Sequence, residues 1–395
     1  MVNMSETFIN ADSEIKDLTD QVITWRRHFH KNPELSFHEE HTSQFVYDML
    51  LSIPHLVVTR PTKTSVMARL IGDLPGKVLA LRADMDALPI TEENQFEFAS
   101  KVAGVMHACG HDGHTAILLG TAKILSGLKN KLRGEIRFLF QHAEELFPGG
   151  AEEMVAVGVM NGVDMVLGAH LWASLPVGIV ATASGPLLAA PDTFRITLLG
   201  KGGHAADPNE TVDPIVIGAH VVTNLQSIVS RYKDPFLPAV VSITQFIAGT
   251  ADNVIPSTAM LTGTVRTFDP VLRDQIPLQM ERVVKGICDA HDANYQFDYQ
   301  HGYRPVINDQ TVSAQLEASL QHTFGENAVV KAEPTMGGED FSAFLQKAPG
   351  AFFLIGAGNE KLGITYPHHH PRFTVDEDAL AIGVKGYVNA VFDLL

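Results

Sequence analysis

The order of the predicted strands and helices changes part-way along the chain, and this change limits the folds that the chain can adopt. Up to Gly185, short β-rich segments alternate with helical patterns, which indicates a mostly parallel sheet with helices on both faces. The segment 193–299 instead follows the order β-α-β-β-α-β of a ferredoxin-like unit, and the α/β alternation resumes from Arg304. We therefore expect a discontinuous α/β domain, residues 1–187 and 301–395, with an α+β domain inserted at 188–300.

Apolar periodicity and β-rich runs give the expected bounds of these elements. The first helix, 14–30, carries apolar residues at helical spacing and ends before Asn32-Pro33. In the outer domain the other predicted helices span 115–128, 150–160, 312–324 and 376–395, and the predicted strands 65–71, 77–83, 135–140, 165–169 and 351–355. In the inserted domain the predicted strands span 193–199, 239–248, 258–267 and 295–299, and the predicted helices 213–231 and 271–289.

Composition argues against several classes of function. The 395 residues carry a formal net charge of -16, which would repel nucleic-acid phosphates and anionic lipid. No stretch has the roughly 18 uninterrupted apolar residues of a membrane span, and residues 1–20 lack the basic and apolar regions of a signal peptide. With only two cysteines, Cys109 and Cys288, a disulfide framework is not expected. We expect a cytoplasmic protein without a nucleic-acid or membrane partner.

One segment concentrates side chains that bind transition metals. The run M-H-A-C-G-H-D-G-H, residues 106–114, precedes a predicted apolar helix and contains glycines that allow close approach of the backbone. Thiolate and imidazole are ligand types that suit zinc and similar metals. Capping and surface histidines are the alternative, but a cysteine interleaved with histidines and an acid is unusual in such a loop. The candidate side chains are His107, Cys109, His111, Asp112 and His114.

Acids and histidines also follow several predicted strands. Taken singly, a glutamate pair is often a solvated loop, and a histidine after a strand is often a core or turn residue. The carboxyl ends of parallel strands, however, meet at one edge of a sheet, where open α/β proteins place their ligand sites. This convergence favours a site with two metal ions. The side chains concerned are Asp84 and Asp86 after 77–83, Glu144 and Glu145 after 135–140, and His170 after Ala169.

A run of three histidines, 368–370, stands before Pro371 near the end of the sequence. Its internal position gives no reason to consider it a purification tag. A surface turn is the alternative to a role in binding metal. We expect at least one of the three to complete a metal shell.

Several motifs together resemble a known family. The chain is similar to the zinc-dependent aminoacylase and carboxypeptidase superfamily, in the branch with hippurate hydrolase, bacterial N-acyl-amino-acid amidohydrolases and plant auxin-conjugate hydrolases. The motifs occur in family order over nearly the whole chain. They are R-R-x-x-H-x-x-P-E-L (26–35), R-A-D-M-D-A-L-P (82–89), M-H-A-C-G-H-D-G-H (106–114), Q-H-A-E-E (141–145), G-A-H (168–170), G-K-G-G-H-A-A-x-P (200–208), D-N-V-I-P (252–256), G-G-E-D-F (337–341) and H-H-P-R-F (369–373).

The resemblance implies a metallopeptidase-type catalytic domain that holds two divalent metal ions per subunit. Glu144 would be the general base, and Asp86 would orient a ligand from behind it. The superfamily motif here is H-x-D, but this chain has Asp84 in place of the histidine. Cys109 would supply the lost ligand, and the role of Asp84 is left open. The implied metal ligands are Cys109, His111, Glu145, His170 and His369.

The resemblance also implies roles for the inserted domain as a lid and dimerisation domain. His204 would reach the active site of the other subunit of a homodimer and stabilise the oxyanion. Asn253 and Arg266 would hold the substrate carboxylate, because the arginine fork binds a carboxylate in bidentate fashion. For Arg266, an ion pair with a surface acid is an equally simple explanation.

Together these features indicate an enzyme that hydrolyses the amide bond of N-acyl amino acids, such as N-acetyl or N-benzoyl derivatives, with a metal-activated water. A dipeptidase or carboxypeptidase of the same superfamily is the alternative. A non-catalytic metal-binding relative is disfavoured because both Glu144 and Glu145 are intact. A zinc-dependent dehydrogenase would need a G-x-G-x-x-G turn, which the sequence lacks. The motifs leave open the acyl group, the amino acid released and the choice among zinc, manganese, cobalt and nickel.

Overall fold

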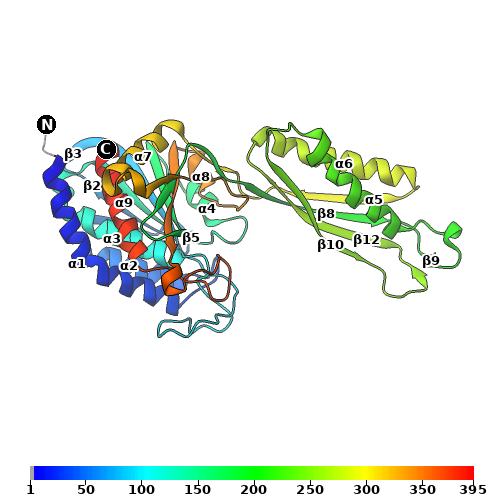
Figure 1. Cartoon of the computed structure of the whole chain (residues 1–395), viewed down its shortest axis with the longest axis horizontal. Coiled ribbons are helices and arrows are strands. Elements are labelled where there is room, and N and C mark those ends of the chain that lie inside the picture. The colour runs from blue at the N-terminus through cyan, green and yellow to red at the C-terminus, as the bar shows by residue number, and fades with distance from the viewer. Residues whose placement is uncertain (1–3) are drawn as a thin grey trace. The chain divides into compact units, whose positions relative to one another are not determined.

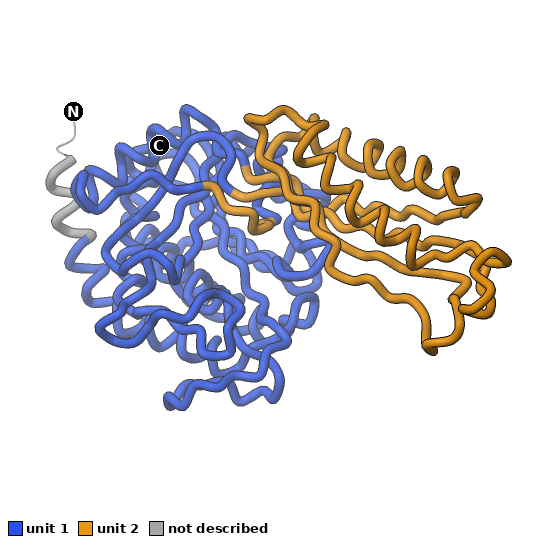
Figure 2. The backbone as a smooth tube through the Cα atoms, turned by 45° about the vertical axis from the view of Figure 1, so that its right-hand side comes forward, with its two compact units in different colours: residues 1–187, 307–333, 340–395 blue, residues 188–306, 334–339 orange. Residues whose placement is uncertain are grey.

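The computed structural model describes residues 4–395, with side chains from residue 12 onward. The expectation that residues 1–20 carry no signal peptide therefore lies partly outside the described residues. The chain divides into two compact units, coloured blue and orange in Figure 2. Unit 1 comprises Met1–Leu187, Ile307–Glu333 and Asp340–Leu395, and unit 2 comprises Leu188–Val306 and Pro334–Glu339.

Unit 1 is built on an eight-stranded mixed sheet with the order β1-β2-β4-β3-β5-β16-β6-β15 (Figure 1). The four central strands β4, β3, β5 and β16 run parallel, and β2 and β6 flank them in antiparallel orientation. Strands β3, β4 and β16 are almost fully buried near their carboxyl ends, as expected for strands covered on both faces. The strands are β1 (Leu56–Thr59), β2 (Val66–Ile71), β3 (Leu74–Asp84), β4 (Arg133–Gln141), β5 (Met165–Pro176), β6 (Val180–Thr182), β15 (Val329–Lys331) and β16 (Gly350–Gly358).

Helices cover both faces of this sheet. On one face α3 is buried along nearly its whole length between the strands and the helices α1 and α9, and on the other face α4 packs against α8 (Figure 1). Their apolar side chains form one continuous core with the strands. The helices are α1 (Met4–Lys31), α2 (Glu40–Leu51), α3 (His111–Gly127), α4 (Gly150–Ala156), α7 (Gln310–Phe324), α8 (Ser342–Leu345) and α9 (Asp378–Leu394). The strands β7 (Gly185–Leu188) and β14 (Val306–Asn308) form a separate two-stranded sheet.

Unit 2 has the expected ferredoxin-like fold. Its antiparallel sheet has the order β10-β12-β8-β13, and α5 and α6 pack on one face around a separate apolar core. Both helices begin with proline after an aspartate whose side chain accepts a hydrogen bond from the first turn, at Asp213 and Asp269. The elements are β8 (Ala190–Leu199), β9 (Gly203–His204), α5 (Pro214–Ser227), β10 (Ala239–Ala248), β11 (Val254–Ile255), β12 (Thr258–Thr267), α6 (Pro270–Ala290) and β13 (Asn294–Gln300).

The elements differ from the sequence predictions in three respects that bear on the site. The helix expected from 115 begins at His111, so part of the cysteine-histidine run lies in its first turn. The strand expected to close with Ala169 continues to Pro176, because β16 pairs with it up to Trp172 and, after a register shift, again at Pro176. Helix α2 was not predicted, because the polar residues Thr42 and Ser43 lie beside Val46 on its buried face and hide the apolar periodicity. No helix among the described residues is long and apolar enough to cross a membrane.

Candidate metal centre

The candidate side chains gather at one edge of the unit 1 sheet. Strands β4, β3 and β5 are adjacent and parallel, so their carboxyl ends lie together. Asp84 ends β3, and Glu144 and Glu145 follow β4. His170 was expected just beyond its strand but lies within β5, two residues past the last residue that pairs with β3. Cys109 lies in the turn immediately before α3, whose first turn contacts Asp84 through His114.

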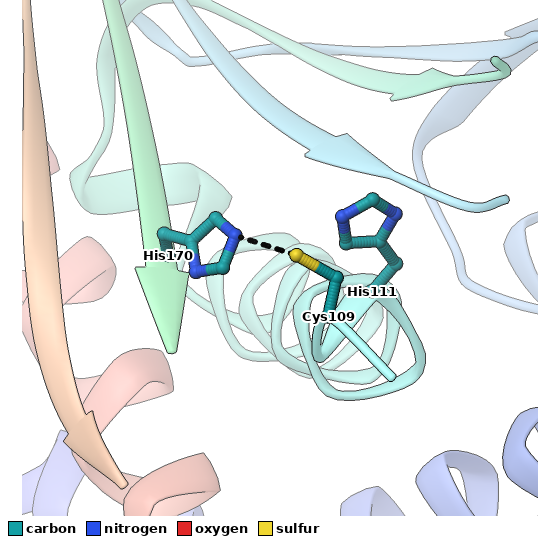
Figure 3. A group of neighbouring side chains, drawn as sticks. All are labelled: Cys109, His111 and His170. Atoms are coloured by element: carbon teal, nitrogen blue, oxygen red, sulfur yellow. Dashed lines mark hydrogen bonds between the residues drawn. The ribbon is translucent and has the colours of Figure 1, made fainter. Parts of the chain in front are cut away.

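Two groups of three donor atoms share the sulfur of Cys109. One group is formed with His111 and His170, and the other with Glu145 and His369, and within each group the atoms lie within 4.8 Å of one another. Figure 3 shows His170 approaching Cys109 from β5 while His111 projects from the start of α3. The Cys109 Sγ and His170 Nε2 atoms are 3.5 Å apart. All five of the metal ligands expected from the sequence therefore converge on one place.

The separations suit ligands that share an ion. Glu145 Oε1 lies 3.2 Å from His369 Nε2 and 3.9 Å from His111 Nε2. Two atoms bound to one zinc ion in a tetrahedral site are roughly 3.4 Å apart. His111 Nε2 and Glu145 Oε1 are both buried and form no hydrogen bond, although His369 is at ion-pair distance from the latter. Buried polar atoms left in this state fit a site that a cation completes.

Of the three consecutive histidines, only His369 faces the donor cluster. Its backbone adopts a left-handed conformation with φ of 64°, and its N–H donates to the carbonyl of Ala108 at 2.8 Å. This bond joins its loop to the turn that carries Cys109. His368 Nε2 instead donates to the carbonyl of Leu171 at 2.9 Å, and the ring of His370 stacks on Tyr366.

Asp86 connects the segments that carry His111 and Glu145. Its Oδ1 accepts a hydrogen bond from His111 Nδ1 at 3.1 Å, which leaves Nε2 of that ring to face the donor cluster. Its Oδ2 accepts from the Glu145 N–H at 2.9 Å and from the Ser36 hydroxyl at 2.6 Å. Burial alone would raise the pKa of Asp86, but hydrogen bonds and the charge of His111 outweigh it and lower the pKa. Asp86 is therefore an ionised anchor.

The cluster is strongly negative. Burial would lower the pKa of His111, but Asp84, Asp86 and Glu145 outweigh it and raise the pKa to about 10. Burial, followed by the charges of Glu145 and Glu144, raises the pKa of the Cys109 thiol well above its usual value. The raised pKa of His111 reports an environment that favours positive charge, and the carboxylates that contribute to the raised pKa of Cys109 act in the same direction. A metal ion can supply that positive charge.

Glu144 lies beside the donor cluster and is buried, with its carboxylate within 4.8 Å of His111 and Glu145. The residue before it, Ala143, has a φ of 49°, and its N–H donates to Glu39 at 2.8 Å. A carboxylate held in this way beside the cluster can move a proton at the point where a substrate would react.

The three functional residues expected in the inserted domain lie in unit 2. His204 and Asn253 are exposed and close together, since β9 pairs with β11 and the Ala205 N–H donates to the Asn253 carbonyl at 3.1 Å. Arg266 is half-buried near the other end of β12. At 3.3 Å per residue, it lies roughly 26 Å along the strand from Thr258. Unit 2 of one chain therefore does not bring Arg266 together with the other two.

Three buried residues that support the cluster, Ser36, Glu39 and Arg82, were not assigned a role from the sequence, and His114 was expected only as a candidate ligand. Ser36 and Glu39 come from the loop before α2 and contact the segments of Asp86 and Glu144. Arg82 and His114 both contact Asp84. Ser36 and Glu39 lie outside the motifs, and the side chain of Arg82 is not a metal ligand type, so the sequence offered no signal for these three.

The fold and this donor set are those of a dinuclear metallohydrolase with a second, ferredoxin-like domain. The model of peptidase family M20/M25/M40 matches residues 80–393. The chain belongs to this family, and within it to the amidohydrolase branch, which makes it a metallo-amidohydrolase.

Relatives with known names support this placement. The N-acyl-L-amino acid amidohydrolase of Geobacillus stearothermophilus is 66% identical over 299 residues, which are 75% of this chain and 81% of that protein. Thermostable carboxypeptidase 2 of Saccharolobus solfataricus is 45% identical over 380 residues, 95% of each chain. The crystal structure of Bacillus subtilis YXEP protein, described as a dinuclear metal binding peptidase from the M20 family, has a TM-score of 0.84 at 37% identity and covers 96% of this chain and 98% of that one.

Proposed function

We propose that this enzyme hydrolyses the amide bond of N-acyl amino acids with two divalent metal ions. The observation that carries the proposal is the pair of donor groups that share Cys109 at the carboxyl edge of the sheet. The relative in Geobacillus stearothermophilus named N-acyl-L-amino acid amidohydrolase supports the substrate class. A mixed shell of sulfur, nitrogen and oxygen suits zinc or manganese and also accommodates cobalt or nickel. The proposed ligands are Cys109, His111, Glu145, His170 and His369.

The proposed chemistry divides between the ions and the side chains. When bound, the ions polarise the scissile carbonyl and lower the pKa of water towards neutrality. Glu144 takes the proton from the attacking water and passes it to the departing amine, which would otherwise leave as a poor anion. Asp86 keeps His111 in the tautomer whose Nε2 faces the cluster, as its 3.1 Å bond to Nδ1 indicates.

Unit 2 is proposed to bind the substrate carboxylate and to serve as a lid. Arg266 is half-buried, and burial lowers its pKa. Among the described residues it forms no ion pair, so the alternative of pairing with a surface acid has no support there. A desolvated guanidinium of this kind favours a carboxylate ligand. Asn253 is the second proposed contact.

A homodimer through unit 2 completes the proposal. His204 would stabilise the oxyanion in the active site of the partner subunit. The dimer is supported by a surface of unit 2 that is suited to a second copy of the chain. Strand β10 is an edge strand, and a group of exposed apolar side chains lies on β10, α5 and β11. These side chains are Ile215, Val216, Phe246, Ile247 and Val254.

A carboxypeptidase activity is the second candidate, because thermostable carboxypeptidase 2 of Saccharolobus solfataricus matches 95% of the chain. Both candidates share the proposed ions and base. They differ in the acyl part of the substrate. In an N-acyl amino acid it comes from a simple carboxylic acid, and in a carboxypeptidase substrate it belongs to a peptide.

The test is release of free amino acid from N-acetyl and N-benzoyl amino acids and from dipeptides, by metal-stripped protein with and without zinc or manganese. We expect metal-dependent release from the N-acyl amino acids, and preferential cleavage of peptides would favour the carboxypeptidase. Glu144→Ala should retain both ions and lose turnover. Mixing Glu144→Ala with His204→Ala should restore some activity if the sites are shared between subunits. Silence of the wild-type protein with every substrate and metal would contradict the proposal.

A further inference from the structure

Asp84 occupies the position where the resemblance implies a metal-binding histidine, yet both of its oxygens are already engaged. The side chain is fully buried at the end of β3. Arg82 Nη1 donates to Oδ2 at 2.7 Å, and His114 Nδ1 lies 2.7 Å from Oδ1. Burial alone would raise the pKa of Asp84, but the charges of Arg82 and His111 and the hydrogen bond from His114 hold it well below its usual range. Asp84 is an ionised carboxylate with two cationic or donor partners.

His114 is also engaged through both ring nitrogens. The N–H of Leu171 donates to Nε2 at 2.8 Å, so Nε2 carries no proton. The proton of the neutral ring must then be on Nδ1, which donates to Asp84. Asp84 and His114 thus link the end of β3 to the backbone of β5, and we call this link the Asp84–His114 bridge.

The bridge contacts β5 beyond the point where the pairing of β5 with β3 ends. Strands β3 and β5 pair only as far as Arg82 and Gly168. The Leu171 N–H lies beyond this pairing, directly after His170. His170 Nδ1 donates to the Leu171 carbonyl at 2.8 Å, which leaves Nε2 directed at the sulfur of Cys109 (Figure 3). Fixing the backbone of Leu171 therefore fixes the ring that faces the cluster.

We propose that Asp84 and His114 are positioning residues that hold His170 for metal binding, and that neither of them is a metal ligand. This proposal rests on the ligand role of His170 in the proposed function. The alternative is a metal ion held by Asp84, His111 and His114, whose donor atoms also lie within 4.8 Å of one another. In that group only His111 Nε2 forms no hydrogen bond to the described residues, and it lies 3.7 Å from Asp84 Oδ2 and 3.9 Å from Glu145 Oε1. For His114 to bind an ion there, one of its ring nitrogens would have to give up its hydrogen bond to Asp84 or to the Leu171 N–H.

The test uses the full chain stripped of metal and reloaded with Co²⁺. His114→Phe keeps the ring volume and removes both hydrogen bonds. We expect it to bind two Co²⁺ per chain with an affinity lowered by about 10- to 100-fold in chelator competition, and with an altered visible spectrum. His114→Gln offers Oε1 to the Leu171 N–H and should recover much of the affinity. Asp84→Asn should likewise retain two ions with weakened binding.

Asp192→Asn is the matched control, because Asp192 is equally buried and pairs with Arg273 at 2.6 Å within unit 2. It should leave Co²⁺ affinity unchanged. Wild-type affinity and an unaltered spectrum in His114→Phe would overturn the bridge. Loss of one whole Co²⁺ from Asp84→Asn would show that Asp84 is a ligand. Failure of the wild-type protein to bind two ions would instead overturn the proposed function, and the two failures are therefore distinguishable.

Discussion

Glu39 provides a direct test of the electrostatics around the site. Its carboxyl group is fully buried, accepts hydrogen bonds from the Ala143 and Phe37 N–H groups, and receives another from the Thr64 hydroxyl. Burial, followed by the charge of Asp86, raises its pKa from the ordinary value of 4.5 to about 7. The folded protein therefore resists the ionisation of Glu39 that the unfolded chain undergoes freely.

The consequence for stability has a definite sign. A carboxyl group with a raised pKa contributes stability that is fully present below pH 4.5 and is lost as the pH rises through about 7. Each pKa unit corresponds to about 1.4 kcal/mol, so the loss is about 3 kcal/mol. Glu39→Gln keeps an oxygen to accept from the Ala143 N–H but cannot ionise. Relative to wild type, its free energy of unfolding should rise by about 3 kcal/mol between pH 4 and pH 8.

The measurement is urea denaturation of the metal-free protein at several pH values, followed by tryptophan fluorescence. Both tryptophans, Trp25 and Trp172, lie in unit 1, so the signal reports the unit that contains Glu39. Glu135→Gln is the control of opposite sign, because hydrogen bonds from Arg69 lower the pKa of Glu135 and its stabilisation is lost on acidification. A difference between Glu39→Gln and wild type that does not change with pH would refute the reasoning.

Three further predictions follow from buried contacts. Arg82→Met removes the buried cation that pairs with both Asp84 and Asp340 and should lower the free energy of unfolding by about 3–5 kcal/mol in urea titrations, and a loss below about 1 kcal/mol would contradict the pairing. Gly113→Ala places a methyl group against the Leu171 side chain and should destabilise by about 1–3 kcal/mol in the same assay, whereas Gly127→Ala, in the same helix with open space around it, should be neutral or stabilising. The raised pKa values of His111 and Cys109 keep both side chains protonated in the metal-free protein between pH 6 and 8, so binding of Zn²⁺ should release protons and should strengthen as the pH rises. Calorimetry in buffers of different ionisation enthalpy counts the released protons. Binding without proton release would contradict the prediction.

The place of the site could be predicted from the sequence because it depends on a general rule. Parallel strands end at one edge, so the acids after β3 and β4 and the histidine of β5 had to lie together. The ferredoxin-like order of unit 2 was predicted for a similar reason, since β-α-β-β-α-β closes in one common way. These are properties of local pattern and chain order.

What escaped the sequence depends on contacts between distant segments. His111 and His114 both lie in the first turn of α3, with ring centres 5.4 Å apart, so their spacing does not reveal that one faces Glu145 and the other faces Leu171. The extension of β5 beyond Ala169 results from pairing with β16, which is nearly 200 residues away in the sequence. Glu39 has no recognisable chemistry until Ala143 is brought against it.

The exchange of histidine for aspartate at position 84 also acquires a physical explanation. A histidine there would meet Arg82, which already donates to Asp340 and would then have one carboxylate fewer to balance its buried charge. His114 would lose the acceptor that sets its tautomer, and the Leu171 N–H would lose a well-defined partner. Asp84 and Arg82 therefore form one buried unit. Cys109 stands where both donor groups overlap, which is the position from which it is proposed to supply the ligand that the resemblance expects at position 84.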